Sequence, residues 1–194
     1  MSALPRLAVL ALLAPACASL DAARRGTAPD VGTWGRVSVL DREDFNYALA
    51  FSADGETLAH AHLSATGFRV ATWTLAPVPV RRSDVQVCRA EWDVEGVALA
   101  PDGSAVFSVA RDGWLRAFDT ASGELLASFD GGEPLVSVAV DAAGGRIAVG
   151  GARGRVALLA WPGLSLRAAA ALHADEVRAV AFTPGGEVWS GGWD

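Results

Sequence analysis

The chain has 194 residues, of which 52% are hydrophobic and 20% are charged. This length and composition are those of a globular domain that can bury a core, so they exclude an intrinsically disordered tail. The formal net charge is −6 at pH 7, and the pairs Arg24-Arg25 and Arg81-Arg82 stand apart from any larger basic stripe. Because binding along a phosphate backbone requires clustered cations, we expect no nucleic-acid partner.

The first eighteen residues predict an export signal. Arg6 precedes an apolar run from Leu7 to Ala14, which is long enough for a signal-peptide core and shorter than the ~20 residues of a membrane-spanning helix. Small residues around Ala16 offer cleavage sites, whereas residues 13–17 resemble a bacterial lipobox, which ends in the cysteine that receives the lipid. Both routes stay open at Cys17. We therefore expect an exported protein, either periplasmic or anchored to the outer membrane through a lipid on Cys17.

The next segments predict a tether and a strand. Residues 19–33 lack hydrophobic periodicity and contain Gly, Pro and charged residues, as flexible linkers do. Polar and apolar residues then alternate from Arg36 to Val39, which predicts a half-buried strand. Further along, alternation places Val85 and Val87 on one face of a strand and Cys88 on the other. This pattern leaves the burial of Cys88 open.

A short phrase recurs at nearly constant spacing along the rest of the chain. It reads VALAPDG at residues 97–103, VAVDAAG at 138–144 and VAFTPGG at 180–186, so the phrases end 41 and 42 residues apart. A looser copy, ALAFSADG, occupies residues 48–55. Strand-like repeats of about 40 to 45 residues are typical of β-propeller blades, four-stranded units that bury their faces against their neighbours.

Each repeat subdivides into short strands separated by Gly-containing turns. In the third repeat the strands are expected at residues 135–140, 146–149, 155–159 and 164–170, and the second repeat has turns at the corresponding places. Turns at this spacing predict antiparallel sheet and disfavour helix after residue 20. The predicted fold class is therefore all-β, an incomplete propeller of about three and a half four-stranded blades. The blades span residues 45–92, 93–132, 133–172 and 173–194, the last one incomplete, with residues 36–39 a candidate outer strand for a blade formed elsewhere in the chain.

These repeats resemble the WD-repeat (WD40) β-propeller family over roughly residues 45 to 194. The segment 114–119 stands where the third strand of the family's repeat ends in Trp-Asp, with Phe118 in place of Trp. Trp73-Thr74 occupies about the same place in the first repeat, and the third repeat has Leu159-Ala160. The resemblance implies a non-catalytic propeller. Its protein or peptide partners would meet the loops that join one blade to the next and the second strand to the third.

The fourth repeat carries the polar residues His173, Ser190 and Asp194. By the resemblance, they match three of the four residues of the family's structural network, in which a turn Asp orients a His, the His bonds a Ser or Thr, and that residue bonds a Trp on the next strand. A Ser, a His and an Asp also suit a hydrolase, but no nucleophile elbow or oxyanion loop surrounds Ser190. We therefore expect a structural network and no catalytic residue.

Two further patterns point away from a metal and a cofactor. His60 and His62 would point the same way from a strand, yet no third metal ligand has a matching spacing. The Gly-rich segment 150–154 joins two predicted strands, so it lacks the helix N-terminus that phosphate-binding loops use. We expect neither a metal nor a cofactor.

Candidate partner-binding residues follow from the loops that the resemblance singles out. These loops would expose Arg111, Arg153 and Trp193, with Trp92 nearby, and Arg and Trp often dominate the energy of protein interfaces. The first hypothesis is thus a protein-binding scaffold. The alternative is the N-terminal sensory or docking part of a larger periplasmic enzyme, with an electron-transfer or hydrolytic domain beyond Asp194. An incomplete propeller also exposes a blade face, which predicts self-association or completion by further blades.

Overall fold

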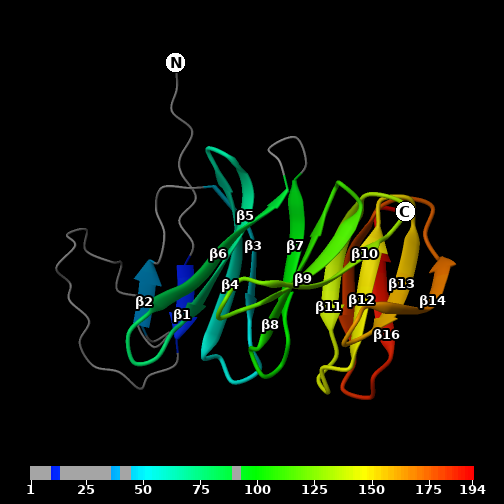
Figure 1. The fold of residues 1–194 in the computed structure, drawn as a ribbon. Helices are drawn as coiled ribbons and strands as arrows, with labels where there is room; N and C mark the ends of the chain where they lie inside the picture. The colour runs from blue at the N-terminus through cyan, green and yellow to red at the C-terminus, as the bar shows by residue number, and fades with distance from the viewer. Residues whose placement is uncertain (1–9, 14–35, 40–44, 89–92) are drawn as a thin grey trace. The chain divides into compact units, whose positions relative to one another are not determined.

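The computed structural model describes residues 10–13, 36–39, 45–88 and 93–194 (Figure 1). The chain divides into two compact units, Met1–Phe45 and Asn46–Asp194. In the first unit, strand β1 (Leu10–Leu13) pairs antiparallel with β2 (Arg36–Val39). The strand expected at residues 36–39 is therefore confirmed, but its partner is β1 and not a strand of a blade. The expected tether at residues 19–33 and Cys17 lie outside the described residues, as does the expected signal peptide at 1–18 apart from β1.

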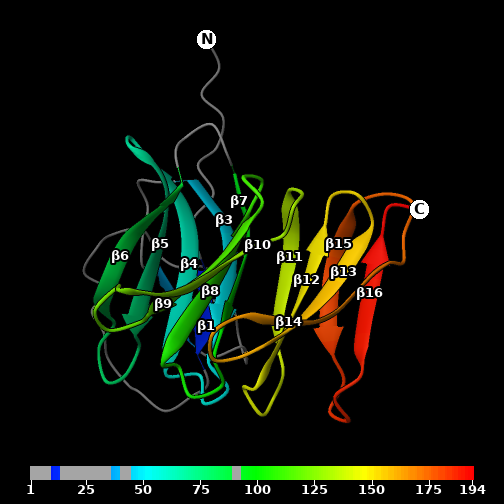
Figure 2. The ribbon, with the colours of Figure 1, turned by 45° about the vertical axis from the view of Figure 1, so that its right-hand side comes forward.

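Every element that the structure describes in the second unit is a β-strand, so the all-β fold class is confirmed (Figures 1 and 2). The strands form three four-stranded antiparallel sheets and one two-stranded sheet, in which each strand pairs with the next along the chain. Blade 1 contains β3 (Phe45–Phe51), β4 (Thr57–Ser64), β5 (Gly67–Thr74) and β6 (Val80–Cys88), and blade 2 contains β7 (Val94–Leu99), β8 (Ala105–Ala110), β9 (Trp114–Asp119) and β10 (Leu125–Asp130). Blade 3 contains β11 (Leu135–Val140), β12 (Arg146–Gly151), β13 (Arg155–Ala160) and β14 (Ser165–Ala171), and half-blade 4 contains β15 (Val177–Phe182) and β16 (Val188–Gly192). The fold is an incomplete propeller of about three and a half blades, as the repeat predicts.

Tight turns that contain Asp and Gly separate the strands, as at Asp102-Gly103 between β7 and β8. The Asp102 carboxylate accepts hydrogen bonds from the backbone N–H of Ser104 at 3.0 Å and from its hydroxyl at 2.7 Å. Gly103 has a φ of 70°, and a Cβ at this position would lie 2.7 Å from Oγ1 of Thr57 in blade 1. Only glycine accepts both the left-handed backbone and this close approach. The turn therefore lets blades 1 and 2 pack closely at this end.

The first strand pair of blades 2 and 3 and of half-blade 4 contains a β-bulge at the same place. The register shifts between residues 94 and 96, 135 and 137, and 177 and 179. These bulges repeat the 41- and 42-residue period of the sequence, and the residues that precede them, Val94, Leu135 and Val177, are all buried. A bulge bends a strand and shifts the alternation of its side chains. Because the bulge recurs, it can serve as a reference point from which equivalent positions of different blades are matched.

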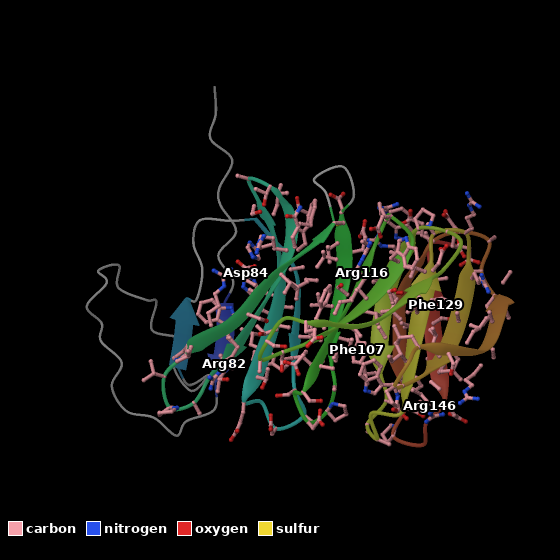
Figure 3. All side chains as sticks on the ribbon, viewed as in Figure 1. Arg82, Asp84, Phe107, Arg116, Phe129 and Arg146 are labelled. Atoms are coloured by element: carbon pink, nitrogen blue, oxygen red, sulfur yellow. The ribbon has the colours of Figure 1, made fainter. Side chains whose placement is uncertain are left out.

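Apolar clusters fill the spaces between neighbouring blades. One cluster joins blade 1 to blade 2 and includes Phe68 and Phe118, and a second joins blade 2 to blade 3 and includes Phe107 and Leu159. Phe107, labelled in Figure 3, is 0% exposed. It meets the ring of Trp161 edge-on, with the ring centroids 4.9 Å apart. The first strands of successive blades contact one another, β7 with β11 and β11 with β15. The equivalent loops of these blades therefore gather at the same end.

Candidate functional site

Three polar residues of half-blade 4 form one hydrogen-bonded chain. His173, in the loop between β14 and β15, has Nδ1 2.8 Å from Oδ1 of Asp194 and Nε2 2.9 Å from Oγ of Ser190 on β16. The other carboxylate oxygen of Asp194 accepts the backbone N–H of Ala174 at 2.8 Å. These hydrogen bonds, first from Ala174 and then from His173, hold the pKa of the Asp194 carboxyl below its usual value. The structure thus brings together the three residues of the expected network.

The equivalent positions of blades 2 and 3 lack this chain of hydrogen bonds. Ser108 on β8 stands at the serine position, is 0% exposed, and has no hydrogen-bond partner for its hydroxyl within the described residues. Asp112 stands at the aspartate position, and its carboxylate accepts a 2.8 Å bond from Arg116. Blade 3 has Val149 and Arg153 at the two positions. Of these three strand pairs, the one in half-blade 4 alone carries the network.

Four charged side chains tie blade 2 to half-blade 4, and we call them the inter-blade charge cluster: Glu95, Arg111, Glu176 and Arg178. Arg111 donates from Nε to Glu95 at 2.5 Å and from its two terminal nitrogens to the carboxylate of Glu176 at 3.0 and 3.3 Å. Arg178 donates from Nη1 to Glu176 at 3.1 Å and to Glu95 at 3.4 Å. Each carboxylate is therefore shared by both guanidinium groups. The cluster links β7 and β15, the strands on either side of β11.

Partial burial strengthens the electrostatics of the inter-blade charge cluster. The side chains of Glu95 and Glu176 are each 15% exposed, against 33% for Arg111 and 38% for Arg178. The hydrogen bond from Arg111 is the main cause that holds the pKa of Glu176 below its usual value, and the hydrogen bonds to Glu176 and then Glu95 raise the pKa of Arg111. Both shifts favour the charged forms of Glu176 and Arg111 at neutral pH. A contact in which two guanidinium nitrogens bond one carboxylate fixes the relative orientation of the two groups and also attracts them to each other.

Trp193 lies beside this cluster and is 67% exposed. Its backbone N–H bonds the carbonyl of Glu176 at 3.2 Å, and the guanidinium of Arg178 lies over its ring, 5.1 Å from the centroid. Such a stack contributes about 0.5–1 kcal/mol at an exposed site. The indole is thus oriented by a side chain that two carboxylates hold in place, while most of its surface faces solvent.

The four candidate partner-binding residues have different surroundings. Arg111 and Trp193 occupy equivalent loop positions, and the charge cluster contains the first and contacts the second. The guanidinium of Arg111 is held by two carboxylates, so it does not lie open in its loop as expected. Arg153 is exposed, and its backbone N–H donates to Oε2 of Glu133 at 2.6 Å. Trp92 lies outside the described residues.

Blade 1 holds a second charged cluster, which the sequence did not indicate. Asp84 on β6 accepts a 3.0 Å bond from Arg69, lies 3.1 Å from Nε2 of His62, and also pairs with Arg81. Burial acts to raise the pKa of Asp84, but the hydrogen bonds from Arg69 and His62 and the charge of Arg81 outweigh it and lower that pKa. The rings of His60 and His62, both 1% exposed, stack 5.1 Å apart. Pairing of β4, β5 and β6 brings Arg69 and Asp84 beside His62, a contact that the spacing of His60 and His62 in the sequence does not indicate.

The geometry of Ser190 suits a structural bond better than nucleophilic attack. Ser190 lies within β16 opposite Val180, and its hydroxyl meets the imidazole of His173. A serine nucleophile of the hydrolase type instead sits on a sharp strand-to-helix turn beside the N–H groups of an oxyanion hole. The network can satisfy three polar groups and fasten the His173 loop to β16.

The chain matches no protein-family model, and no curated protein matches it. Among the side chains that the structure describes, no group of three or more His, Cys, Asp or Glu could hold a metal ion. A search of the same residues finds no helix with the length and hydrophobicity to cross a membrane.

Proposed function

We propose that this chain is a non-catalytic protein-binding scaffold, an exported WD-repeat propeller segment that presents the loops around Trp193 to a protein or peptide partner. The observation that carries the proposal is Trp193 itself, which is 67% exposed yet held by Arg178 and by its backbone bond to Glu176. A side chain that is already ordered loses little conformational entropy when a partner covers it. Exposed Trp residues of this kind often dominate interface energies.

The inter-blade charge cluster stiffens the end of the blades at which Trp193 lies. Two of its salt bridges join blade 2 to half-blade 4, Arg111 to Glu176 and Glu95 of β7 to Arg178 of β15. On the other side of Trp193, the bond between Asp194 and His173 holds the adjoining loop. Arg153 is exposed in the equivalent loop of blade 3, where it is available to a partner's carboxylate.

Three features support membership of the WD-repeat family. The 41- and 42-residue period of the sequence recurs in the bulges. The third strands β5, β9 and β13 end at Trp73-Thr74, Phe118-Asp119 and Leu159-Ala160, where the family places Trp-Asp. Half-blade 4 adds the hydrogen-bonded His, Ser and Asp.

The test compares two tryptophans of equal exposure on different surfaces. Partner proteins are cross-linked to the chain in its native host and quantified by mass spectrometry. Trp193→Ala should reduce capture of the partner roughly tenfold or more. Trp189→Ala, whose side chain is also 67% exposed, should leave capture unchanged. Equal capture by both variants would refute a partner site at Trp193.

Export is part of the proposal, because residues 1–18 have the pattern of a signal peptide. Mass spectrometry of the protein from its native host or a bacterial surrogate should show loss of at least the first sixteen residues. A diacylglyceryl mass on Cys17 would select the lipoprotein route. An intact Met1 or Ser2 at the N-terminus of soluble cytoplasmic protein would contradict export.

A further inference from the structure

We draw no further inference here: the strongest candidate, the side-chain cluster of His60, His62, Arg69, Arg81 and Asp84 on the face of blade 1 that points away from blade 2, carries nothing because nothing in the described part of the chain shows what covers this face.

Discussion

Blade 2 and half-blade 4 place equivalent residues of one strand pair in opposite surroundings. Phe107 on β8 is 0% exposed, whereas Trp189, at the same position of β16, is 67% exposed. The serines that follow them also differ. Ser108 is buried and has no partner for its hydroxyl in the described part of the chain, while Ser190 bonds His173.

The difference separates what the repeat determines from what its neighbours determine. Both strand pairs carry the same bulge, and both aromatic residues lie opposite an alanine, Ala98 or Ala181. Backbone geometry is therefore set within the repeat. Removing apolar surface from water stabilises the fold by about 25 cal/mol per Å². Whether a side chain is buried in this way depends on whether another sheet covers the outer face, as blade 3 covers Phe107. The same side-chain type thus packs a core in blade 2 and forms a surface in half-blade 4.

The largest expected effect tests this contrast directly. Phe107→Ala should lower the free energy of unfolding by about 3–5 kcal/mol, because it removes a buried aromatic ring and leaves a cavity. Trp189→Ala should change it by about 0.5 kcal/mol or less, since surface substitutions have small effects. Urea denaturation at equal protein concentration measures both. Losses of similar size would mean that the outer face of half-blade 4 is covered in solution.

The two serines provide the next comparison. Ser190→Ala should lower the free energy of unfolding by about 1 kcal/mol, because His173 loses a hydrogen-bond partner. Ser108→Ala removes a buried hydroxyl that has no partner within the described residues, so it should be neutral or slightly stabilising. Chemical denaturation decides between them. The reverse order would contradict a stabilising role for the network.

A smaller effect is expected on the acid side of the stability profile. The pKa of Asp194 is lower in the folded chain than its usual value, through the bonds from Ala174 and His173. Its contribution to stability is therefore present above the unfolded pKa of about 3.9 and is lost as the pH falls below that value toward the folded pKa. Asp194→Asn should flatten the fall in melting temperature over this range. Identical acid-side slopes for the two proteins would show that the bonds to Asp194 are not kept in solution.

The last prediction is the absence of a reaction. A serine-directed fluorophosphonate probe should leave Ser190 unlabelled, because its hydroxyl lies on a paired strand and serves His173 as a structural partner. Intact-protein mass spectrometry gives the readout, with a known serine hydrolase in the same tube as the positive control. Stoichiometric labelling that disappears in His173→Ala would instead establish a catalytic serine.

The blades could be predicted from the sequence because their signals are local. The turn at Asp102-Gly103 and the short apolar runs lie within one repeat, so period and turn chemistry were sufficient. The outer strand expected from residues 36–39 was different, because alternation predicts a strand without naming its partner. That strand pairs with β1.

Features that depend on register or on distant contacts could not be predicted. Alternation left the burial of Cys88 open, but a bulge in β6 places Phe68 opposite Cys88 and Arg69 opposite Gln86, so Val87 is the extra residue and both it and Cys88 are buried. Burial is the main cause that raises the pKa of Cys88 to about 11. A one-residue insertion of this kind leaves no mark on composition.

The candidate site shows the same limit. His173, Ser190 and Asp194 lie within one repeat and were found through its resemblance to a known family. The inter-blade charge cluster cannot be predicted from the sequence, because Arg111 and Glu176 are 65 positions apart in the chain. Equivalent positions of different repeats meet there, Glu95 of β7 with Arg178 of β15, and a spacing rule within one repeat cannot reveal such a contact.

The inter-blade charge cluster also bears on how the array unfolds. Repeat proteins are commonly described as sums of unit stabilities and adjacent interfaces, so that a terminal unit can open without disturbing any but its immediate neighbour. Here Arg111 and Glu95 of blade 2 hold Glu176 and Arg178 of half-blade 4 across an intervening blade. When the last strands open, two carboxylate–guanidinium partners are released two units away. This longer-range coupling makes fraying of the C-terminal strands more cooperative than a nearest-neighbour chain would allow.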